Sequence, residues 1–309
     1  MTYKKRGIII FLDILGTKSM INEEAAVSFL NKLDNLFELL DEYSSGIKKL
    51  KKFFNTNDSN YVFRKDPHIK KTIPFKDLIG FINSFNIEIS TFSDTIIIAV
   101  YSDELDIEDA FIIQLSGLLL VPLIRLAFKM ELFLKGTISI GDFYIRKKEN
   151  NKTIIVGPAI TEAAESYTLS NWIGISTSPS ASLTLEQDPQ LNEFKSLVEI
   201  LDISLERKNI SLNDSFHLIF NVFVRENIPR KNGIEKDGWA LAWPLFYNNE
   251  VLNTDIENIL QKNLDYKKFQ TQPVTDNIYM KMKNTNEFYY RMIRNNDVKN
   301  LDDIIPHFD

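Results

Sequence analysis

The 309-residue chain has no cysteine and only three histidines, and this excludes several kinds of chemistry at the outset. Without cysteine, the protein has no disulfide bonds, no thiol nucleophile and no thiolate zinc site. His68, His217 and His307 are too scattered in sequence to indicate a metal site or a catalytic triad. The lack of cysteine is compatible with a reducing compartment, and we expect a cytoplasmic protein.

The chain also lacks a positive net charge and an uninterrupted apolar run long enough to cross a membrane. Its net charge of −6 gives no general reason to expect nucleic-acid binding. The apolar segment 109–128 contains Gln114, Pro122 and Arg125, which favours a buried helix. At the N-terminus, Asp13 and Lys18 interrupt the apolar residues, so we expect a mature strand and not a signal peptide. We therefore expect neither nucleic acid nor a membrane among the partners.

The hydrophobic pattern predicts an α/β protein, an α+β sandwich whose central, mostly antiparallel sheet is backed by helices on one face. The expected elements are a strand at 7–13, a helix at 22–43, two strands within 85–101, a helix at 107–128, a strand at 131–141, a hairpin at 142–157, a helix at 158–170 and a strand at 172–176. A tight turn at Ser93 and Asp94 joins the two strands of 85–101.

We expect one catalytic domain over residues 1–250 and a polar, helical extension over residues 251–309. Residues 46–76 form a basic insertion in that domain. We favour a solvated loop there, the alternative being a collar that attracts a polyanion such as a nucleoside triphosphate. Segments 215–224 and 238–247 are predicted strands, and Trp239 and Trp243 are expected in the core.

Two acids are placed where chemistry is expected. Asp13 comes at the end of the first strand, and Asp94 lies in the turn between the next two strands. Two neighbouring carboxylates repel each other unless a cation lies between them, and Mg²⁺ commonly takes one or two carboxylates together with substrate phosphates. Asp94 alone is adequately explained as a turn residue. Together with Asp13, it favours a metal site.

The segment "DILGT" permits a competing interpretation. Phosphatases of the haloacid dehalogenase family carry Asp-x-Asp-Gly-Thr after a buried strand. Here Leu15 stands where their second aspartate, the general acid, belongs, so the leaving group lacks a proton donor. This leaves the phosphatase as a third hypothesis.

Four motifs in order resemble those of the class III nucleotidyl cyclases. "FLDILGT" at residues 11–17 is similar to the end of that family's first strand, and "FSDTIIIAV" at 92–100 to its metal-binding hairpin, with Ser93 in place of the usual glycine. "LKGTISIG" at 134–141 and the helix entry "GPAITEAAESYTL" at 157–169 complete the series. The details look like the bacterial pyrimidine cyclases of the Pycsar antiphage systems.

The resemblance implies a cyclase that converts UTP, or alternatively CTP, to a 3′,5′-cyclic monophosphate, which then acts on a separate effector protein. It implies two Mg²⁺ or Mn²⁺ ions bound by Asp13, Asp94 and the Ile14 carbonyl. A phosphate cradle would be formed by the backbone amides of Leu15, Gly16, Thr17 and Lys18. It also implies a homodimer with active sites at the interface, where the partner supplies the helix around Thr161.

The departures from the family pattern bear on mechanism and specificity. Thr161 stands at the position of the asparagine that holds the ribose, and Glu165 at that of the arginine that stabilises the transition state. A glutamate does not stabilise growing negative charge, so another cation is required, and Lys135 is our candidate. The alternative for Lys135 is a solvated lysine at a strand entrance. Ser90, at the base-reading position, argues against ordinary ATP or GTP recognition.

Glu165 also supports a second hypothesis of a different class, a cyclase-fold protein that binds or senses nucleotide without turning it over. Retention of both aspartates is the main difficulty for that hypothesis.

Overall fold

The computed structural model describes residues 2–15, 27–38, 40, 85–102, 112–113, 116–117, 120–121, 123–124, 127–128, 130, 132–148, 153–187, 222–246 and 276–295. Three of our sequence predictions lie outside these residues. They are residues 16–18 of the phosphate cradle expected at 15–18, the basic insertion at 46–76, and residues 215–221 of the strand expected at 215–224. The described end of that predicted strand belongs to β7, which begins at Phe223.

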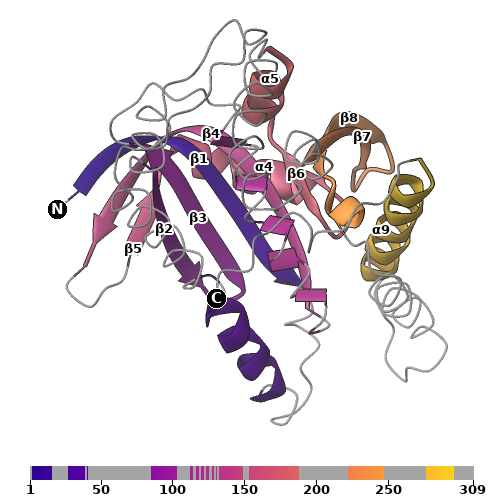
Figure 1. The fold of residues 1–309 in the computed structure, drawn as a ribbon, viewed down its shortest axis with the longest axis horizontal. Coiled ribbons are helices and arrows are strands. Elements are labelled where there is room, and N and C mark those ends of the chain that lie inside the picture. Colours follow the sequence, from indigo (N-terminus) through magenta and orange to yellow (C-terminus); the bar gives the residue numbers. More distant parts are fainter. Residues whose placement is uncertain are drawn as a thin grey trace, which may run out of the picture.

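The protein is built around one sheet of eight strands, which Figure 1 shows. The strands are β1 (Thr2–Leu15), β2 (Phe85–Phe92), β3 (Thr95–Ser102), β4 (Phe133–Lys147), β5 (Thr153–Val156), β6 (Ile175–Thr177), β7 (Phe223–Pro229) and β8 (Glu235–Leu241). Their order is β2-β3-β1-β4-β6-β8-β7, and β5 pairs with β4. Only β4 and β6 run parallel, so the predicted mostly antiparallel sheet is confirmed.

The first four strands follow a split βαβ arrangement. Helical residues lie between β1 and β2, at 27–38 and 40, and between β3 and β4, at 112–113, 116–117, 120–121, 123–124 and 127–128. Because β1 is central and pairs with both β3 and β4, the order β2-β3-β1-β4 is that of a ferredoxin-like unit. The central place of β1 explains its continuous apolar sequence.

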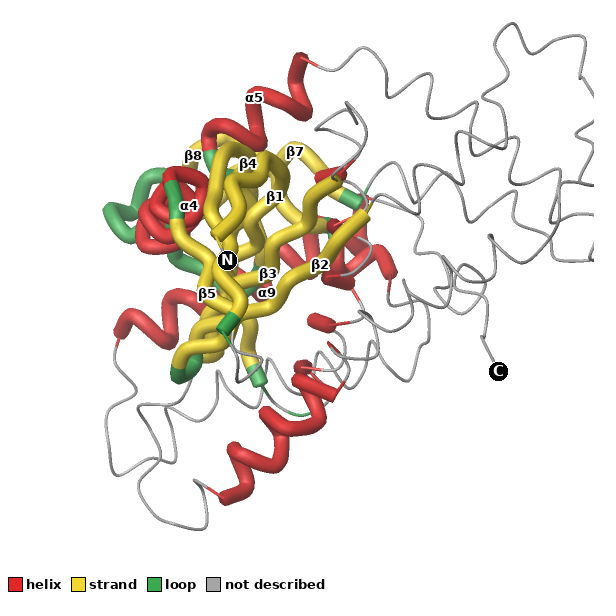
Figure 2. The backbone as a smooth tube through the Cα atoms, turned by 90° about the vertical axis from the view of Figure 1, so that its left-hand side faces the viewer, coloured by secondary structure: helices red, strands yellow, loops and turns green. Residues whose placement is uncertain are grey.

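Helices cover both faces of the sheet, whereas the sequence predicted helices on one face. Alternate residues of β1, such as Ile10 and Leu12, pack in a large core with helical residues of both connections, among them Leu36 and Ile124. Ile9, on the opposite face, packs with Ala159 and Ala163 of helix α4 (Pro158–Leu169). Figure 2 shows α4 on its own side of the strands. Because β1 is apolar on both faces, each face requires a cover.

Strand β4 runs further than predicted. We expected it to end at Gly141, but it continues to Lys147 and pairs with β1 along its whole length. Gly141 lies opposite Gly7 inside this ladder. At Gly7 a Cβ atom would lie 2.4 Å from the Val100 carbonyl oxygen, so Gly7 allows β3 to approach β1 closely.

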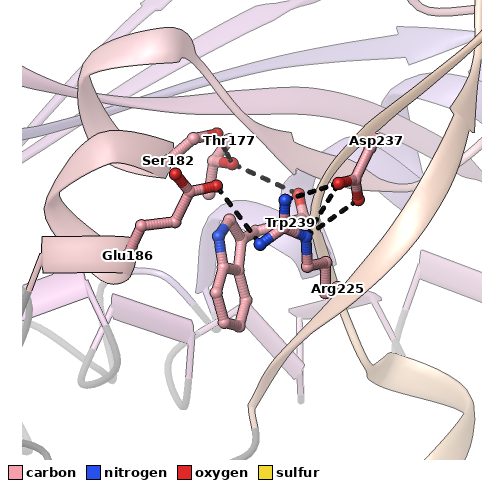
Figure 3. A network of polar contacts seen from close by, with 6 residues as sticks. All are labelled: Thr177, Ser182, Glu186, Arg225, Asp237 and Trp239. Carbon is pink, nitrogen blue, oxygen red and sulfur yellow. Dashed lines mark hydrogen bonds and ion pairs between the residues drawn. The ribbon is translucent and has the colours of Figure 1, made fainter.

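The hairpin of β7 and β8 is fastened to the rest of the sheet by a polar network (Figure 3). Arg225 Nε donates to both carboxylate oxygens of Asp237, at 2.8 and 3.0 Å, and its guanidinium lies 3.7 Å from Glu186 of helix α5 (Pro179–Gln187). Thr177 of β6 bonds Ser182 and donates to the Trp239 carbonyl oxygen. These contacts join the β7–β8 hairpin to α5 and to β6.

The C-terminal region contributes to the same core. Helix α9 (Asp276–Asn295) lies in the segment expected to be a polar, helical extension, and it buries four large apolar side chains: Met282, Phe288, Tyr289 and Met292. Phe288 packs 4.7 Å from Trp172, and Tyr289 lies 5.9 Å from Trp243, between ring centroids.

Two further expectations concern the tryptophans and the strand ends. Trp243 is fully buried as predicted, whereas Trp239 is only partly buried. The expected strand at 238–247 ends at Leu241, and a 3₁₀ turn (Trp243–Phe246) follows. Among the described residues, no helix is long and apolar enough to cross a membrane.

Candidate metal and nucleotide site

The two predicted acids meet at one end of the sheet. Asp13 lies opposite Thr95, and Asp94 is in the two-residue turn directly before Thr95. The Ile14 amide donates to the Asp94 carbonyl oxygen at 2.9 Å, which fixes the turn against the end of β1. The negative charge of Asp94 contributes to raising the pKa of Asp13, as expected for carboxylates that lie close together.

The turn itself explains the residue before Asp94. Ser93 has φ of 57°, while Asp94 does not have positive φ. A positive φ at only the first central residue is the pattern of a type II′ hairpin turn, where glycine is preferred. Ser93 therefore occupies a left-handed position, which glycine adopts most easily.

Asp13 lies beneath helix α4, where Tyr167 donates a hydrogen bond to its Oδ2 atom. The Tyr167 ring also packs 5.4 Å from that of Phe11. Burial is the largest cause of the raised pKa of Asp13, and the hydrogen bond from Tyr167 opposes it. Burial and the bond to Asp13 raise the pKa of Tyr167, so its hydroxyl stays a neutral donor.

Sequence reasoning missed Tyr167. Its one signal is position, because it comes one helical turn after the buried Ala163 and so shares the inward face of α4.

Lys135 lies opposite Asp13 in β4, and it is 1% exposed. Its Nζ atom donates to the Ser170 carbonyl oxygen at 2.8 Å and lies 4.1 Å from the centroid of the Tyr167 ring. Burial, followed by the charges of Lys281 and Lys231, lowers the pKa of Lys135 to about 7. The alternative of a solvated lysine is therefore wrong, and the ammonium lies under the C-terminal end of α4.

The remaining predicted residues lie elsewhere. Ser90 donates to the Thr153 carbonyl oxygen at 2.8 Å and so joins β2 to β5. Thr161 and Glu165 are exposed on α4, and Thr161 approaches the Gly157 carbonyl of its own helix. Their expected role toward a second subunit stays a prediction. Leu15 is partly buried against the large core.

The residues at this end of the sheet fit a divalent cation. Asp13 and Asp94 supply two carboxylates whose mutual repulsion a cation would relieve. The Ile14 amide faces the hairpin turn, and in an extended strand the carbonyl of the same residue points to the same side. Within the described parts of the chain, no cluster of three or more metal-binding side chains occurs, so further ligands would be water or substrate phosphate.

No protein-family model matches the chain, and no curated protein is similar in sequence. Among solved structures, the catalytic core of a rhodopsin-guanylyl cyclase with converted specificity, in complex with ATPαS, has 10% sequence identity and a TM-score of 0.39; the match covers 78% of this chain and 98% of that one. A class III adenylyl cyclase-like ATP-binding protein from Pseudomonas aeruginosa has 11% identity and a TM-score of 0.39, over 61% of this chain and 37% of that one.

A guanylate cyclase domain from Catenaria anguillulae in complex with GTP has 10% identity and a TM-score of 0.39, over 78% and 97% of the two chains. At these TM-scores the similarities assign neither family nor function. The proposal below rests on the motifs of this chain and the geometry of its own site.

Proposed function

We propose that the protein is a nucleotidyl cyclase, which converts a nucleoside triphosphate to its 3′,5′-cyclic monophosphate and pyrophosphate. One observation carries the proposal: Asp13 and Asp94, far apart in sequence, lie at the same end of the sheet, where the Ile14 amide donates to the Asp94 carbonyl oxygen and the charge of Asp94 acts on Asp13. Paired carboxylates at a strand end and a hairpin turn are the donor set for divalent cations that bind polyphosphate.

In this reaction the ribose 3′-oxygen forms a bond to the α-phosphorus, the bond from that phosphorus to pyrophosphate breaks, and the hydroxyl proton is released. Bound Mg²⁺ or Mn²⁺ would lower the pKa of the 3′-hydroxyl and offset the charge of the pyrophosphate. Asp13 and Asp94 would hold these ions, with the Ile14 carbonyl. Tyr167 holds one oxygen of Asp13 and restricts its rotation, so the carboxylate is oriented before the ligands arrive.

For the base we propose a pyrimidine, with UTP favoured over CTP. The support is the resemblance to the Pycsar cyclases and the serine at position 90. A serine supplies neither the lysine nor the glutamate used for purine readout. Its hydroxyl also already donates to the Thr153 carbonyl oxygen. The proposed biological role is a signal generator in antiphage defence, acting as a homodimer whose cyclic product activates a separate effector.

One observation favours the second candidate, a nucleotide-binding protein without turnover. The hydroxyl of Tyr167 engages Asp13, and Glu165 stands where a transition-state cation is expected. The phosphatase is less well supported, because Leu15 is packed against the core and supplies no acid.

The test is incubation of the purified protein with UTP, CTP, ATP or GTP and Mn²⁺, with identification of any cyclic product by mass spectrometry. We expect cyclic UMP, and loss of product in Asp13→Asn and Asp94→Asn. Asp142→Asn is the matched control, because Asp142 is a β4 carboxylate ion-paired with Lys4, near the opposite end of β1 from Asp13.

Each outcome separates the hypotheses. A cyclic purine would refute the pyrimidine assignment, and turnover unchanged in Asp13→Asn would refute the metal assignment. Binding of triphosphate without any product would support the nucleotide-binding protein. Release of phosphate from simple phosphomonoesters would support the phosphatase.

A further inference from the structure

Helix α4 carries Tyr167 to Asp13, but apolar packing holds this helix only weakly. Its buried residues are all small: Ala159, Ala163 and Ser166. Because such side chains bury little apolar area, they stabilise the contact between helix and sheet only modestly. Polar contacts therefore contribute much of what fixes α4 in place.

The strand beneath α4 is polar as well. Lys135, Thr137 and Ser139 alternate along the face of β4 that α4 covers. Ser139 Oγ donates to the Ala159 carbonyl oxygen. Thr137 Oγ1 is fully buried and has no hydrogen-bond partner among the residues that the structure describes. Because apolar packing on such a surface is sparse, the hydrogen bonds to α4 set the position of the helix.

Glu162 supplies one of these bonds near the start of α4. Its two carboxylate oxygens accept from Ser180, one from the amide at 2.8 Å and the other from the hydroxyl at 2.7 Å. Ser180 is the second residue of α5, and the first amides of a helix have no partner within it. Hydrogen bonding and the helix dipole both favour a carboxylate at this end. Glu162 of one helix therefore caps the next helix.

Ser180 is itself fixed to the sheet. The Ile140 amide of β4 donates to the Ser180 hydroxyl at 3.2 Å. A chain of hydrogen bonds thus runs from β4 through Ser180 to Glu162. It ties α4 to the same strand whose Lys135 lies opposite Asp13.

Glu162 and Tyr167 lie on different sides of α4. Their separation along the helix corresponds to about 7.5 Å in the axial direction and about 140° around the axis. Two bonds on different sides of a helix fix both its axial position and its rotation. Without the bond at Glu162, α4 would be free to turn or slide on the polar surface, and the Tyr167 hydroxyl would leave the Asp13 carboxylate.

We propose that Glu162 is a positioning residue for the metal site: by holding α4 to α5 and β4, it keeps the Tyr167 hydroxyl on Asp13 and the carboxylate oriented for a divalent cation. The link from Glu162 to Tyr167 rests on the contacts above, whereas its consequence for a cation rests on the metal site of the proposed function. Removing a group that orients a metal ligand typically weakens metal binding by roughly 10- to 100-fold. Because Glu162 acts one step further away, we expect a smaller effect.

A double-mutant cycle in the metal-free protein tests the link itself. In the wild type, Tyr167→Phe should raise the unfolding equilibrium constant about fivefold, since a half-buried acceptor loses its donor. In Glu162→Ala the same change should have an effect of about twofold or less, because the bond is already lost. Urea unfolding measures all four proteins. Equal effects of Tyr167→Phe in both backgrounds would overturn the link. Ser180→Ala, which removes only the hydroxyl, gives the same comparison if Glu162→Ala does not fold.

Mn²⁺ titrated calorimetrically into the full-length protein tests the consequence. Glu162→Ala should bind Mn²⁺ about fivefold more weakly than wild type, with no further loss when Tyr167→Phe is added. Glu162→Gln should recover most of the affinity, because its side-chain oxygen accepts from the Ser180 amide and its NH₂ group donates to the Ser180 hydroxyl. Glu226→Ala is the matched control and should keep the wild-type affinity. It also removes one half-buried carboxylate, here ion-paired with Arg291 of α9, so it changes the net charge equally.

The outcomes separate this inference from the proposed function. Unchanged Mn²⁺ affinity in Glu162→Ala, or an equal loss in Glu226→Ala, would overturn the positioning role even if cyclic nucleotide is formed. Selective loss in Glu162→Ala that Glu162→Gln restores would uphold the role, even if no triphosphate gives a cyclic product and the cyclase is refuted. A further loss on adding Tyr167→Phe would show that Glu162 acts independently of that tyrosine, and it too would overturn the inference.

Discussion

Tyr167 and Asp13 are 154 positions apart in sequence, yet the tyrosine hydroxyl donates a hydrogen bond to the aspartate carboxylate. The bond fastens the last turn of α4 to the end of β1. The bond uses one of the two carboxylate oxygens. The protonation of Asp13 and the position of α4 therefore depend on each other.

Tyr167→Phe should destabilise the protein by about 1 kcal/mol, because the half-buried Asp13 oxygen then loses its donor. The same variant should bind Mn²⁺ more weakly, since the carboxylate is no longer held in one orientation. Urea unfolding and a Mn²⁺ titration measure the two effects. Tyr144→Phe, an exposed tyrosine of β4, should change neither, and an unaltered Mn²⁺ affinity in Tyr167→Phe would show that the bond is only structural.

Asp13→Asn should raise the melting temperature of the metal-free protein at pH 7. The pKa of Asp13 is raised above its ordinary 3.8, so the folded state binds the proton more tightly than the unfolded chain. The stability from this group is fully present below pH 3.8 and is lost as the pH rises through the folded pKa. Asparagine has no such loss and still accepts a hydrogen bond from Tyr167.

Mn²⁺ should reverse this order. It should raise the melting temperature of the wild type, because a ligand that binds only the folded state stabilises it, and it should have little effect on Asp13→Asn. Scanning fluorimetry with EDTA or Mn²⁺ gives both comparisons. If the metal-free Asp13→Asn protein is less stable than wild type at pH 7, the ionised Asp13 carboxylate does not destabilise the fold.

Lys135 should give the stability a distinct pH dependence at alkaline pH. Its pKa falls from 10.5 to about 7 on folding, so between these values the unfolded chain binds a proton that the folded protein does not. Stability should therefore rise with pH in this window, by at most about 1.4 kcal/mol per pH unit.

Urea unfolding at pH 7, 8, 9 and 10 measures that slope in wild type and Lys135→Met. The variant should have a smaller slope, whatever its absolute stability without the bond to Ser170. The exposed Lys236→Met serves as control and should keep the wild-type slope. Parallel curves for wild type and Lys135→Met would mean that the buried amine keeps its proton.

Gly136→Ala should destabilise the protein by about 1–3 kcal/mol through overpacking. A Cβ atom at Gly136 would lie 2.7 Å from the Phe11 carbonyl oxygen and 2.5 Å from a methyl of Leu12. At Gly238 the nearest atom would be 3.4 Å away, so Gly238→Ala is the mild control. Equal unfolding midpoints for the two variants would show that β1 moves aside at no cost.

The elements could be predicted where one pattern extends over many residues. A continuous apolar run predicted β1, two apolar runs around a turn predicted the β2–β3 hairpin, and proline before helical spacing predicted α4. The strand ends placed Asp13 and Asp94 at the same end of the sheet, where the structure has them. Gly141 misled the prediction of β4, because a glycine inside a strand ladder looks the same in sequence as one that ends a strand in a turn.

Contacts between distant elements could not be predicted. The bond from Tyr167 to Asp13 and the burial of Lys135 depend on how α4 crosses the sheet, which no local pattern specifies.

The packing of α9 determines how the protein can be divided for experiments. A fragment that ends before Asp276 would uncover the rings of Trp172 and Trp243, which Phe288 and Tyr289 now cover. We therefore expect such a fragment to aggregate when expressed, although it keeps both Asp13 and Asp94. A fragment that keeps α9 must extend to Asn295, although the four cyclase-like motifs all lie before residue 170.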